Sequence, residues 1–323
     1  MRDAAIIPLV DLKSSDAVLT IRQACEQTGF FYLVNHAVPR ALIDAQYAAT
    51  ARLFDLPAEG KAVLSSRFST AGNGYDPMNS QILQKGAASD LKESYHCGPE
   101  LDADHPYVQR GLPRYGHNLW PSNLPGFRAQ CLAYFTTMQG LGEQIMDGIA
   151  LSLDLPQRWF RPYYNLPMSD LRLLHYPSVD GPALPDQFGA GAHTDWGAVT
   201  ILAQDDVGGL EVMTADGDWI DAPPIPGSFV INIGQLIARW TNGRYRSNLH
   251  RVRTNRTGRS RYSIPFFYNP DFDARIECLD ICLGEGGTPR WAPCTAGEHI
   301  DQMRRASMAR VTLPPDAAPV PAL

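Results

Sequence analysis

The sequence predicts a mainly β protein with flanking helices. Six short runs rich in β-branched and aromatic residues follow one another between Ser169 and Pro270, with turn residues between them. Several short strands at such regular spacing indicate a sandwich or a barrel. Helical periodicity is found before and after this region. With 323 residues, of which 44% are hydrophobic, the chain is long enough to bury a large core without disulfide bonds.

The N-terminal part alternates strand and helix patterns. Residues 6–12 (IIPLVDL) indicate a short strand, and the helix that follows is expected to end at Gly29. Residues 30–36 (FFYLVNH) indicate a second strand, and Pro39 can begin the next helix. Residues 65–121 are irregular in pattern, and because loops of this length are usually functional, we expect this segment to cover a site.

Two further helices are expected. Apolar residues recur every three or four positions from Phe127 to Ile149, which predicts a long helix that packs on the core. Thr295 and Glu298 form a TxxE capping box, which predicts the start of a C-terminal helix. A Pro- and Ala-rich tail follows this helix, and we expect it to fray.

Composition limits the classes of partner and compartment. The formal net charge of −6 and the pI of about 5.7 argue against a nucleic-acid partner, which favours basic surfaces. The sequence has no run of about 18 apolar residues, so no membrane span is predicted. The apolar N-terminal patch is too short for a signal peptide. We therefore expect a cytoplasmic protein that is a monomer or a weak homo-oligomer. The six cysteines are expected to be free thiols, since Cys278 and Cys282 have no second pair to complete a zinc site.

A candidate metal site lies in the segment GAHTDWGAVTIL. His193 and Asp195 are two residues apart, so on an extended strand they point to the same face. His250 follows 55 residues after Asp195 (250 − 195), far enough for a rolled-up sheet to place a second strand beside the first. Two histidines and one carboxylate on one face of an octahedron are typical of non-haem Fe(II) oxygenases. A hydrolytic zinc site is the competing interpretation.

A candidate anion site follows in the segment RYSIPFF. Arg261 and Ser263 are two residues apart and share a strand face. Arg261 lies 11 residues after His250 (261 − 250), within the reach of a hairpin. The planar guanidinium of arginine matches a carboxylate, and serine adds a hydroxyl donor. The apolar residues after Ser263 indicate that Arg261 begins a buried strand. We therefore expect this pair to bind the far carboxylate of a dicarboxylic acid beside the metal.

These motifs resemble those of a known family. The runs HTDWGAVTILAQDDVGGLEVM, DWIDAPPIPGSFVINIGQ, WTNGRYRSNLHRV and RYSIPFFYNP resemble the Fe(II)- and 2-oxoglutarate-dependent dioxygenases of the isopenicillin N synthase-like group. The N-terminal runs IPLVDL, GFFYLVNHAVP and LFDLPAEGKAVL resemble the N-terminal region of the same group. The likeness therefore covers nearly the whole chain.

The resemblance implies a fold and a domain organisation. It implies a double-stranded β-helix core (a cupin-like jelly roll) flanked by helices. The expected regions are an N-terminal α/β region, a long helix with its connector, the jelly-roll core that binds Fe(II) and 2-oxoglutarate, and a C-terminal helix with its tail. They span residues 1–121, 122–167, 168–275 and 276–323, respectively.

The resemblance also implies site residues and an activity. His193, Asp195 and His250 would be the iron ligands. Arg261 and Ser263 would bind 2-oxoglutarate, and Tyr176 stands where many members have a tyrosine that contacts co-substrate or substrate. The implied activity is the oxidation of a C–H bond of a small molecule by O2 (hydroxylation, desaturation or cyclisation), with release of succinate and CO2.

Some features remain open at this point. Leu174 replaces an asparagine that is frequent two places before the tyrosine, and Gln235 replaces a frequent acidic residue. We expect the substrate pocket to include Phe267 and Tyr75. The basic residues that can bind a substrate carboxylate are Arg67, Lys85 and Lys92, and the sequence does not choose among them.

Three other functions are consistent with parts of the pattern. An oxidase like isopenicillin N synthase would use the same metal ligands without 2-oxoglutarate, although the sequence HTDWG favours the 2-oxoglutarate users. A zinc hydrolase would leave Arg261 and Ser263 unexplained. A non-catalytic metal-binding jelly roll would be expected to lack a ligand, whereas all three ligands are present.

Overall fold

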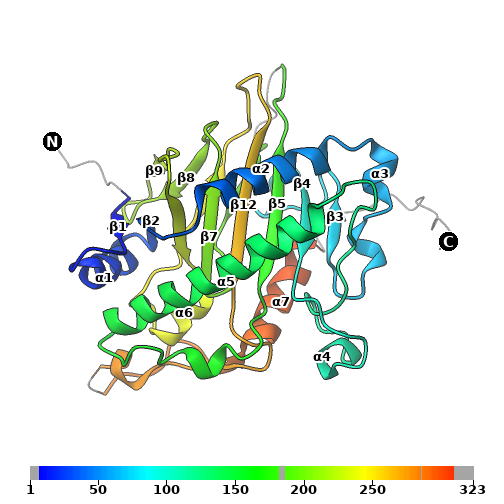
Figure 1. Ribbon diagram of the computed structural model, residues 1–323. Coiled ribbons are helices and arrows are strands. Elements are labelled where there is room, and N and C mark those ends of the chain that lie inside the picture. Colours follow the sequence, from blue (N-terminus) through cyan, green and yellow to red (C-terminus); the bar gives the residue numbers. More distant parts are fainter. Residues whose placement is uncertain (1–6, 182–185, 285, 309–323) are drawn as a thin grey trace.

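The computed structural model describes residues 7–181, 186–284 and 286–308, and in it two β-sheets pack face to face (Figure 1). The larger sheet has eight strands, which are β1 (Leu9–Asp11), β2 (Phe30–Val34), β3 (Gly74–Asp76), β4 (Glu93–Cys97), β5 (Asp170–Tyr176), β7 (Val199–Gln204), β10 (Phe229–Ile233) and β12 (Arg261–Tyr268). Their order is β1-β2-β10-β7-β12-β5-β4-β3. The smaller sheet has four strands, which are β6 (Ala190–His193), β8 (Leu210–Met213), β9 (Trp219–Asp221) and β11 (His250–Val252).

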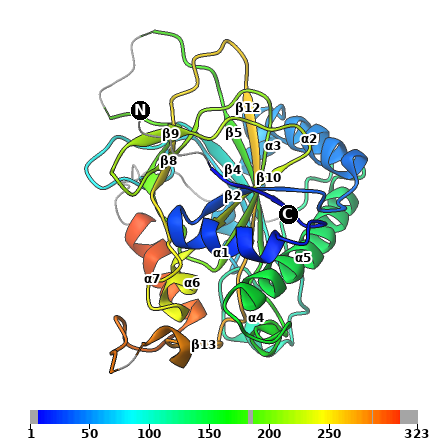
Figure 2. The same cartoon turned by 90° about the vertical axis from the view of Figure 1, so that its left-hand side faces the viewer.

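Helices cover the outer face of the larger sheet. The α-helices are α1 (Ala17–Gln27), α2 (Arg40–Phe54), α3 (Ala58–Ala62), α4 (Pro106–Gln109), α5 (Phe127–Ser152), α6 (Gln235–Trp240) and α7 (Ala296–Met308). Figure 2 shows β8 and β9 on one side of the larger sheet and α2 and α5 on the other. The molecule therefore has three layers, and the site described below lies between the two sheets.

Strand β2 of the larger sheet is apolar on both of its faces. Phe30 and Tyr32 pack toward the smaller sheet, in a cluster that includes residues of β6, β8 and β11. Phe31 and Leu33 point the other way, into the core formed with α1 and α5. Successive residues of a strand alternate between its faces, and β2 is apolar throughout because both of its faces are covered by apolar clusters.

The elements predicted from the pattern are largely confirmed. The double-stranded arrangement of the β-rich region agrees with the expected jelly roll, and the long helix and the capping box are present. Thr295 accepts a hydrogen bond from the backbone N–H of Glu298 (3.3 Å), and its hydroxyl donates to the Glu298 carboxylate (2.8 Å). All six cysteines are free. The C-terminal tail that we expected to fray (309–323) lies outside the described residues.

The prediction that residues 65–121 are irregular throughout was wrong for β3, β4 and α4. Strand β4 has the sequence ESYHC, in which polar residues fill positions that are buried here. Glu93 is paired with Lys61 and His175, and His96 with Asp170. Because these charges find partners only in the folded chain, a hydrophobic pattern cannot reveal the strand.

The strands of the N-terminal region belong to the same sheet as those of the core. β2 pairs with β10, and β4 pairs with β5. The N-terminal region therefore completes the larger sheet on both sides of the core strands. Among the residues described, no helix combines the length and the apolar composition needed to cross a membrane.

Candidate active site

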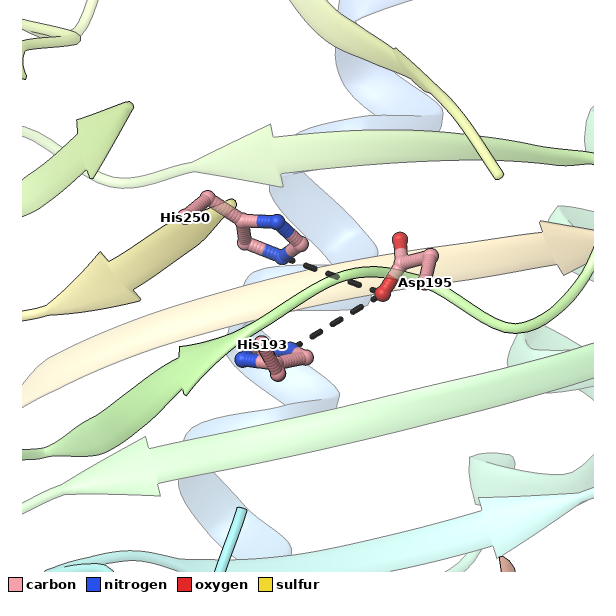
Figure 3. Close-up of side chains that lie close together, drawn as sticks. All are labelled: His193, Asp195 and His250. Carbon is pink, nitrogen blue, oxygen red and sulfur yellow. Dashed lines mark ion pairs between the residues drawn. The ribbon is translucent and has the colours of Figure 1, made fainter. Parts of the chain in front are cut away.

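Two histidines face each other on neighbouring strands of the smaller sheet. β6 ends at His193 and β11 begins at His250, and the two residues are directly opposite in the antiparallel register. Their ring centres are 4.2 Å apart (Figure 3). The prediction that the strand carrying His250 lies beside the strand carrying His193 is therefore confirmed. β12 then crosses over to the larger sheet, so Arg261 reaches the site from the opposite side and not through a hairpin.

Asp195 completes the group from a loop. We had expected His193 and Asp195 to lie on one continuous strand. Instead, β6 ends at His193, and Asp195 reaches the histidines through the loop that follows. Its Oδ1 lies 3.8 Å from His193 Nε2 and 3.7 Å from His250 Nε2, and Figure 3 shows both imidazoles directed at this oxygen. The other oxygen, Oδ2, accepts hydrogen bonds from Thr200 Oγ1 and Asn232 Nδ2. These two donors fix the carboxylate so that Oδ1 is left for a ligand.

The protonation states suit metal binding. Nδ1 of His193 lies 2.7 Å from the carbonyl oxygen of Gly191, which can only accept, so Nδ1 carries the proton and Nε2 is free. Burial, helped by the neighbouring His250, lowers the pKa of His193 to about 3, which keeps the imidazole neutral. Burial alone would raise the pKa of Asp195, but the two histidines and the hydrogen bonds from Thr200 and Asn232 together bring it below its ordinary value.

The three side chains can hold one metal ion. Their ligand atoms all lie within 4.8 Å of one another, and no other such group of His, Cys, Asp or Glu occurs among the residues that the structure describes. Neutral imidazole and ionised carboxylate are the forms that bind divalent cations. Asp195 is only 8% exposed, so a bound ion would be largely shielded from solvent by protein.

Arg261, Ser263 and Tyr176 form a second group, on the larger sheet. β12 pairs with β5 so that Arg261 is opposite Tyr176 and Ser263 is opposite Leu174. Arg261 is 1% exposed, and its guanidinium lies 4.8 Å from the centre of the Tyr176 ring. Nη2 is 3.5 Å from Gln204 Oε1, while Nε and Nη1 have no hydrogen-bond partner among the described residues.

A buried guanidinium with two unpartnered nitrogens is unfavourable unless an anion binds to it. The arrangement therefore fits a ligand carboxylate, which accepts two parallel hydrogen bonds from arginine. The buried Ser263 hydroxyl on the same face of β12 can add a third. The two unpartnered nitrogens of Arg261 thus support a binding position for a carboxylate ligand at this end of the site.

Both groups line one cavity between the sheets. The remaining lining is mostly apolar and includes four further polar or charged side chains, Lys92, Arg172, Thr200 and Asn232. The cavity is lined by Phe30, Leu83, Lys92, Arg172, Leu174, Tyr176, Ala190, His193, Asp195, Thr200, Leu202, Leu210, Asn232, His250, Val252, Arg261, Ser263, Pro265 and Phe267.

Of the two residues predicted for the substrate pocket, Phe267 lines the cavity and Tyr75 does not. Phe267 lines the cavity, on the same face of β12 as Arg261 and Ser263. Tyr75 is not among the lining residues, and its hydroxyl donates a hydrogen bond of 2.5 Å to Glu93 instead. Of the three basic candidates, only Lys92 lines the cavity.

Sequence reasoning missed Thr200, Asn232 and Arg172. Thr200 and Asn232 each interrupt an otherwise apolar run, AVTIL and FVINI, and a single polar residue in a buried strand is the signal that would have revealed them. Gln235, the second departure noted in the sequence, donates to Thr194 Oγ1 (2.7 Å) and contacts His299 (2.8 Å). It therefore connects α6 and α7 to the loop that carries Asp195.

Comparison with known proteins agrees with this geometry. Residues 167–270 match the 2OG-Fe(II) oxygenase superfamily, and residues 7–123 match the N-terminal region described as that of a non-haem dioxygenase in morphine synthesis. A curated relative, the 2-oxoglutarate-Fe(II) type oxidoreductase hxnY of Emericella nidulans, is 38% identical over 300 residues. That alignment covers 91% of this chain and 85% of the relative.

Solved structures are similar over nearly the full length. An enzyme of Neurospora crassa, solved in complex with alpha-KG and thymine, superposes with a TM-score of 0.82 at 28% identity, covering 95% of this chain and 98% of the other. A putative 2OG-Fe(II) oxygenase family protein of Caulobacter crescentus gives a TM-score of 0.81 at 31% identity, covering 94% and 99% of the two chains.

Proposed function

We propose, from the premise that this chain belongs to the 2OG-Fe(II) oxygenase superfamily, that His193, Asp195 and His250 bind the iron and that Arg261, Ser263 and Tyr176 bind 2-oxoglutarate. The chain is an enzyme of the class that uses Fe(II), 2-oxoglutarate and O2.

The metal assignment rests on the donor set. Two neutral imidazoles and one carboxylate occupy one face of an octahedral ion and leave the opposite face open for exchangeable ligands. A structural zinc site would instead be closed by a fourth protein ligand. Among the described residues, no fourth His, Cys, Asp or Glu joins the group.

The single observation that carries the co-substrate assignment is the unpaired guanidinium of Arg261. It is almost fully buried, it has two nitrogens without a partner, and it lines the same cavity as the metal group. A dicarboxylic co-substrate that binds the metal with one end would satisfy Arg261 and Ser263 with its other carboxylate. Tyr176 would hold the guanidinium in place through its ring.

Bound iron, together with 2-oxoglutarate and O2, supplies the oxidising power, and the co-substrate leaves as succinate and CO2. The protein orients the reactants and excludes water. Asn232 and Thr200 hold Asp195, Phe30 packs its ring against His250 at 5.4 Å, and Phe267 forms an apolar wall of the cavity. The reaction proposed is oxidation of a C–H bond, giving hydroxylation, desaturation or cyclisation.

The substrate proposed is a small molecule and not a nucleic acid, because the cavity is enclosed between two sheets and the chain is acidic, with a net charge of −6. The solved relative from Neurospora crassa is described as a complex with thymine, a small molecule. We further propose a cytoplasmic protein that acts as a monomer or a weak homo-oligomer, on the basis of its free cysteines and acidic composition.

The first test uses the metal and the co-substrate alone. Metal-free protein is mixed with Fe(II) without oxygen, 2-oxoglutarate is added, and the visible spectrum is recorded. A new weak charge-transfer band is expected; it should be absent in His193→Ala, weaker in Arg261→Ala and unchanged in His105→Ala, whose ring caps α4 away from the cavity. Tight Fe(II) binding without the band would favour an oxidase that does not use 2-oxoglutarate, and failure to bind Fe(II) would refute the metal assignment.

A further inference from the structure

A second arginine points into the cavity from β5. Arg172, Leu174 and Tyr176 alternate along this strand, share one face and all line the cavity. The register that pairs Ser263 with Leu174 and Phe266 with Leu171 sets Arg172 opposite Pro265. Arg172 is four residues from Tyr176, about 13 Å along the strand, so its backbone is well removed from the end of the site where Arg261 lies.

Arg172 lacks a carboxylate partner. Its Nη2 is 3.1 Å from Gln81 Oε1 and 3.1 Å from Ser94 Oγ, both neutral groups. Its Nε is buried without a hydrogen-bond partner, and it forms no ion pair with any carboxylate in the described part of the chain. Asp170, two residues earlier on the same strand, is engaged by His96 (2.8 Å) and Arg114 (3.2 Å).

The other cation in this part of the cavity already has its counter-ion. Lys92 is 4% exposed and forms a buried ion pair with Asp90, whose other oxygen accepts a hydrogen bond of 3.0 Å from the backbone of Gly191. Burial lowers the pKa of Lys92 to about 8 against the opposing effect of Asp90, and Arg172 adds to the lowering. Lys92 is therefore fixed beside Arg172 by a carboxylate that is also bound to the strand carrying His193.

Among the charged residues that line the cavity, Arg172 is the cation without a carboxylate in contact; Asp170 on the same strand acts on it only at longer range. With the function proposed above, the two charges of Fe(II) and the one of Arg261 balance those of Asp195 and the 2-oxoglutarate dianion. Lys92 and Asp90 cancel each other. Arg172 is then left without a contacting counter-ion in a largely apolar cavity, where an anionic ligand would stabilise it.

We propose that Arg172 binds an acidic group of the primary substrate, so that the substrate class is small organic acids with an apolar body. Leu83, Pro265 and Phe267, which line the cavity, would contact that body. This inference rests on the proposed function for its charge balance, while the unpaired side chain of Arg172 supports it independently. Arg172 acts here as a substrate-binding residue, distinct from the co-substrate residue Arg261.

The test compares acids with their amides, which have nearly the same shape and no charge. Benzoate, phenylacetate, 3-phenylpropionate and hexanoate, each paired with its amide, are added without oxygen to the protein loaded with Fe(II) and 2-oxoglutarate, and the shift of the charge-transfer band is titrated. With O2, succinate release is measured for each. At least one acid is expected to bind and to stimulate release while its amide does so at least about 30-fold more weakly. If no acid of the series binds, or if amides bind as well as acids, the proposal is refuted.

Three variants locate the effect. Arg172→Gln should remove the preference for the acid and leave the affinity for 2-oxoglutarate unchanged, and Arg172→Lys should retain part of the preference. Arg275→Gln, which alters an exposed arginine paired with Glu277, is the matched control and should behave as the original protein. An unchanged preference in Arg172→Gln, or loss of 2-oxoglutarate binding in that variant, would overturn the assignment.

A separate arm distinguishes failure of this inference from failure of the proposed function. Calorimetry with metal-free protein and the same acid and amide pairs requires neither iron nor co-substrate. Acid binding that is lost in Arg172→Gln but kept in Arg261→Gln supports the inference even if no charge-transfer band forms. Acid binding that is lost only in Arg261→Gln would show that the acids occupy the co-substrate position, and would refute it.

Discussion

Asn232 Nδ2 donates a hydrogen bond to Asp195 Oδ2. Asn232 lies on β10 of the larger sheet, and Asp195 lies on the loop that follows β6. Thr200 donates to the same oxygen from β7. Both donors lie on strands with buried surroundings, whereas Asp195 lies on a loop. The two strands thus fix the position of the carboxylate, in the way that the neighbours of a metal ligand usually orient it, which agrees with the role proposed for Asp195.

Replacing Asn232 by Ala should therefore weaken iron binding without removing a ligand. We expect the Fe(II) affinity to fall by about 10- to 100-fold, because partners that orient a metal ligand typically contribute this much. Anaerobic titration with Fe(II) measures the effect, with Asn165→Ala, an exposed asparagine, as the control. Unchanged affinity in Asn232→Ala would mean that Thr200 alone holds Asp195.

Replacing Arg261 by Gln should affect only co-substrates that have a distal carboxylate. We expect the dissociation constant of 2-oxoglutarate to rise by at least about 30-fold, because a buried charge-assisted pair is lost. The affinity for 2-oxopentanoate, which lacks the second carboxylate, should change little. Titration of the charge-transfer band with both acids measures the difference, and equal weakening of the two would indicate that the variant disturbs the metal site.

The juxtaposition of His193, Asp195 and His250 was predictable from the sequence because part of their spacing is local. His193 and Asp195 are two residues apart, and the β-rich run before His250 indicated a returning strand. The pattern could not show that β6 ends at His193, since the end of a short strand depends on its pairing with β11. The grouping of these three side chains was therefore accessible, and the geometry of Asp195 was not.

The part of the cavity lined by Arg172 and Lys92 was not predictable, for a different physical reason. Arg172 and Lys92 are 80 residues apart (172 − 92), and both line the cavity because β4, which begins directly after Lys92, pairs with β5. Strand β4 is polar in sequence, so its presence, and hence this pairing, is hidden from a hydrophobic pattern. A site formed by paired charges on a strand of this kind becomes visible only in the folded chain.

Phe267 and Tyr75, the two residues predicted for the substrate pocket, should give different results when truncated. Phe267→Ala enlarges the cavity, so we expect weaker substrate binding and more succinate release that is not coupled to substrate oxidation. Tyr75→Phe removes only the hydrogen bond to Glu93, and should cost about 1 kcal/mol of stability with coupling unchanged. The ratio of succinate to oxidised substrate, measured together with urea unfolding, distinguishes the effects of the two variants. Altered coupling in Tyr75→Phe would indicate that Tyr75 contacts the substrate after all.

Two glycines of α5 allow a matched test of how the long helix packs on the larger sheet. A Cβ added at Gly142 would lie 2.5 Å from the ring of Tyr268 on β12, whereas one added at Gly140 meets nothing within 4 Å. Gly142→Ala should lower the free energy of unfolding by about 1–3 kcal/mol, since the ring or the helix must shift. Gly140→Ala should raise it by up to about 1 kcal/mol, because alanine favours the helix. Urea unfolding of both variants gives the comparison. Equal stability changes would mean that α5 can move away from β12 at little cost, and the close contact between Gly142 and Tyr268 would then not be needed to hold the helix on the sheet.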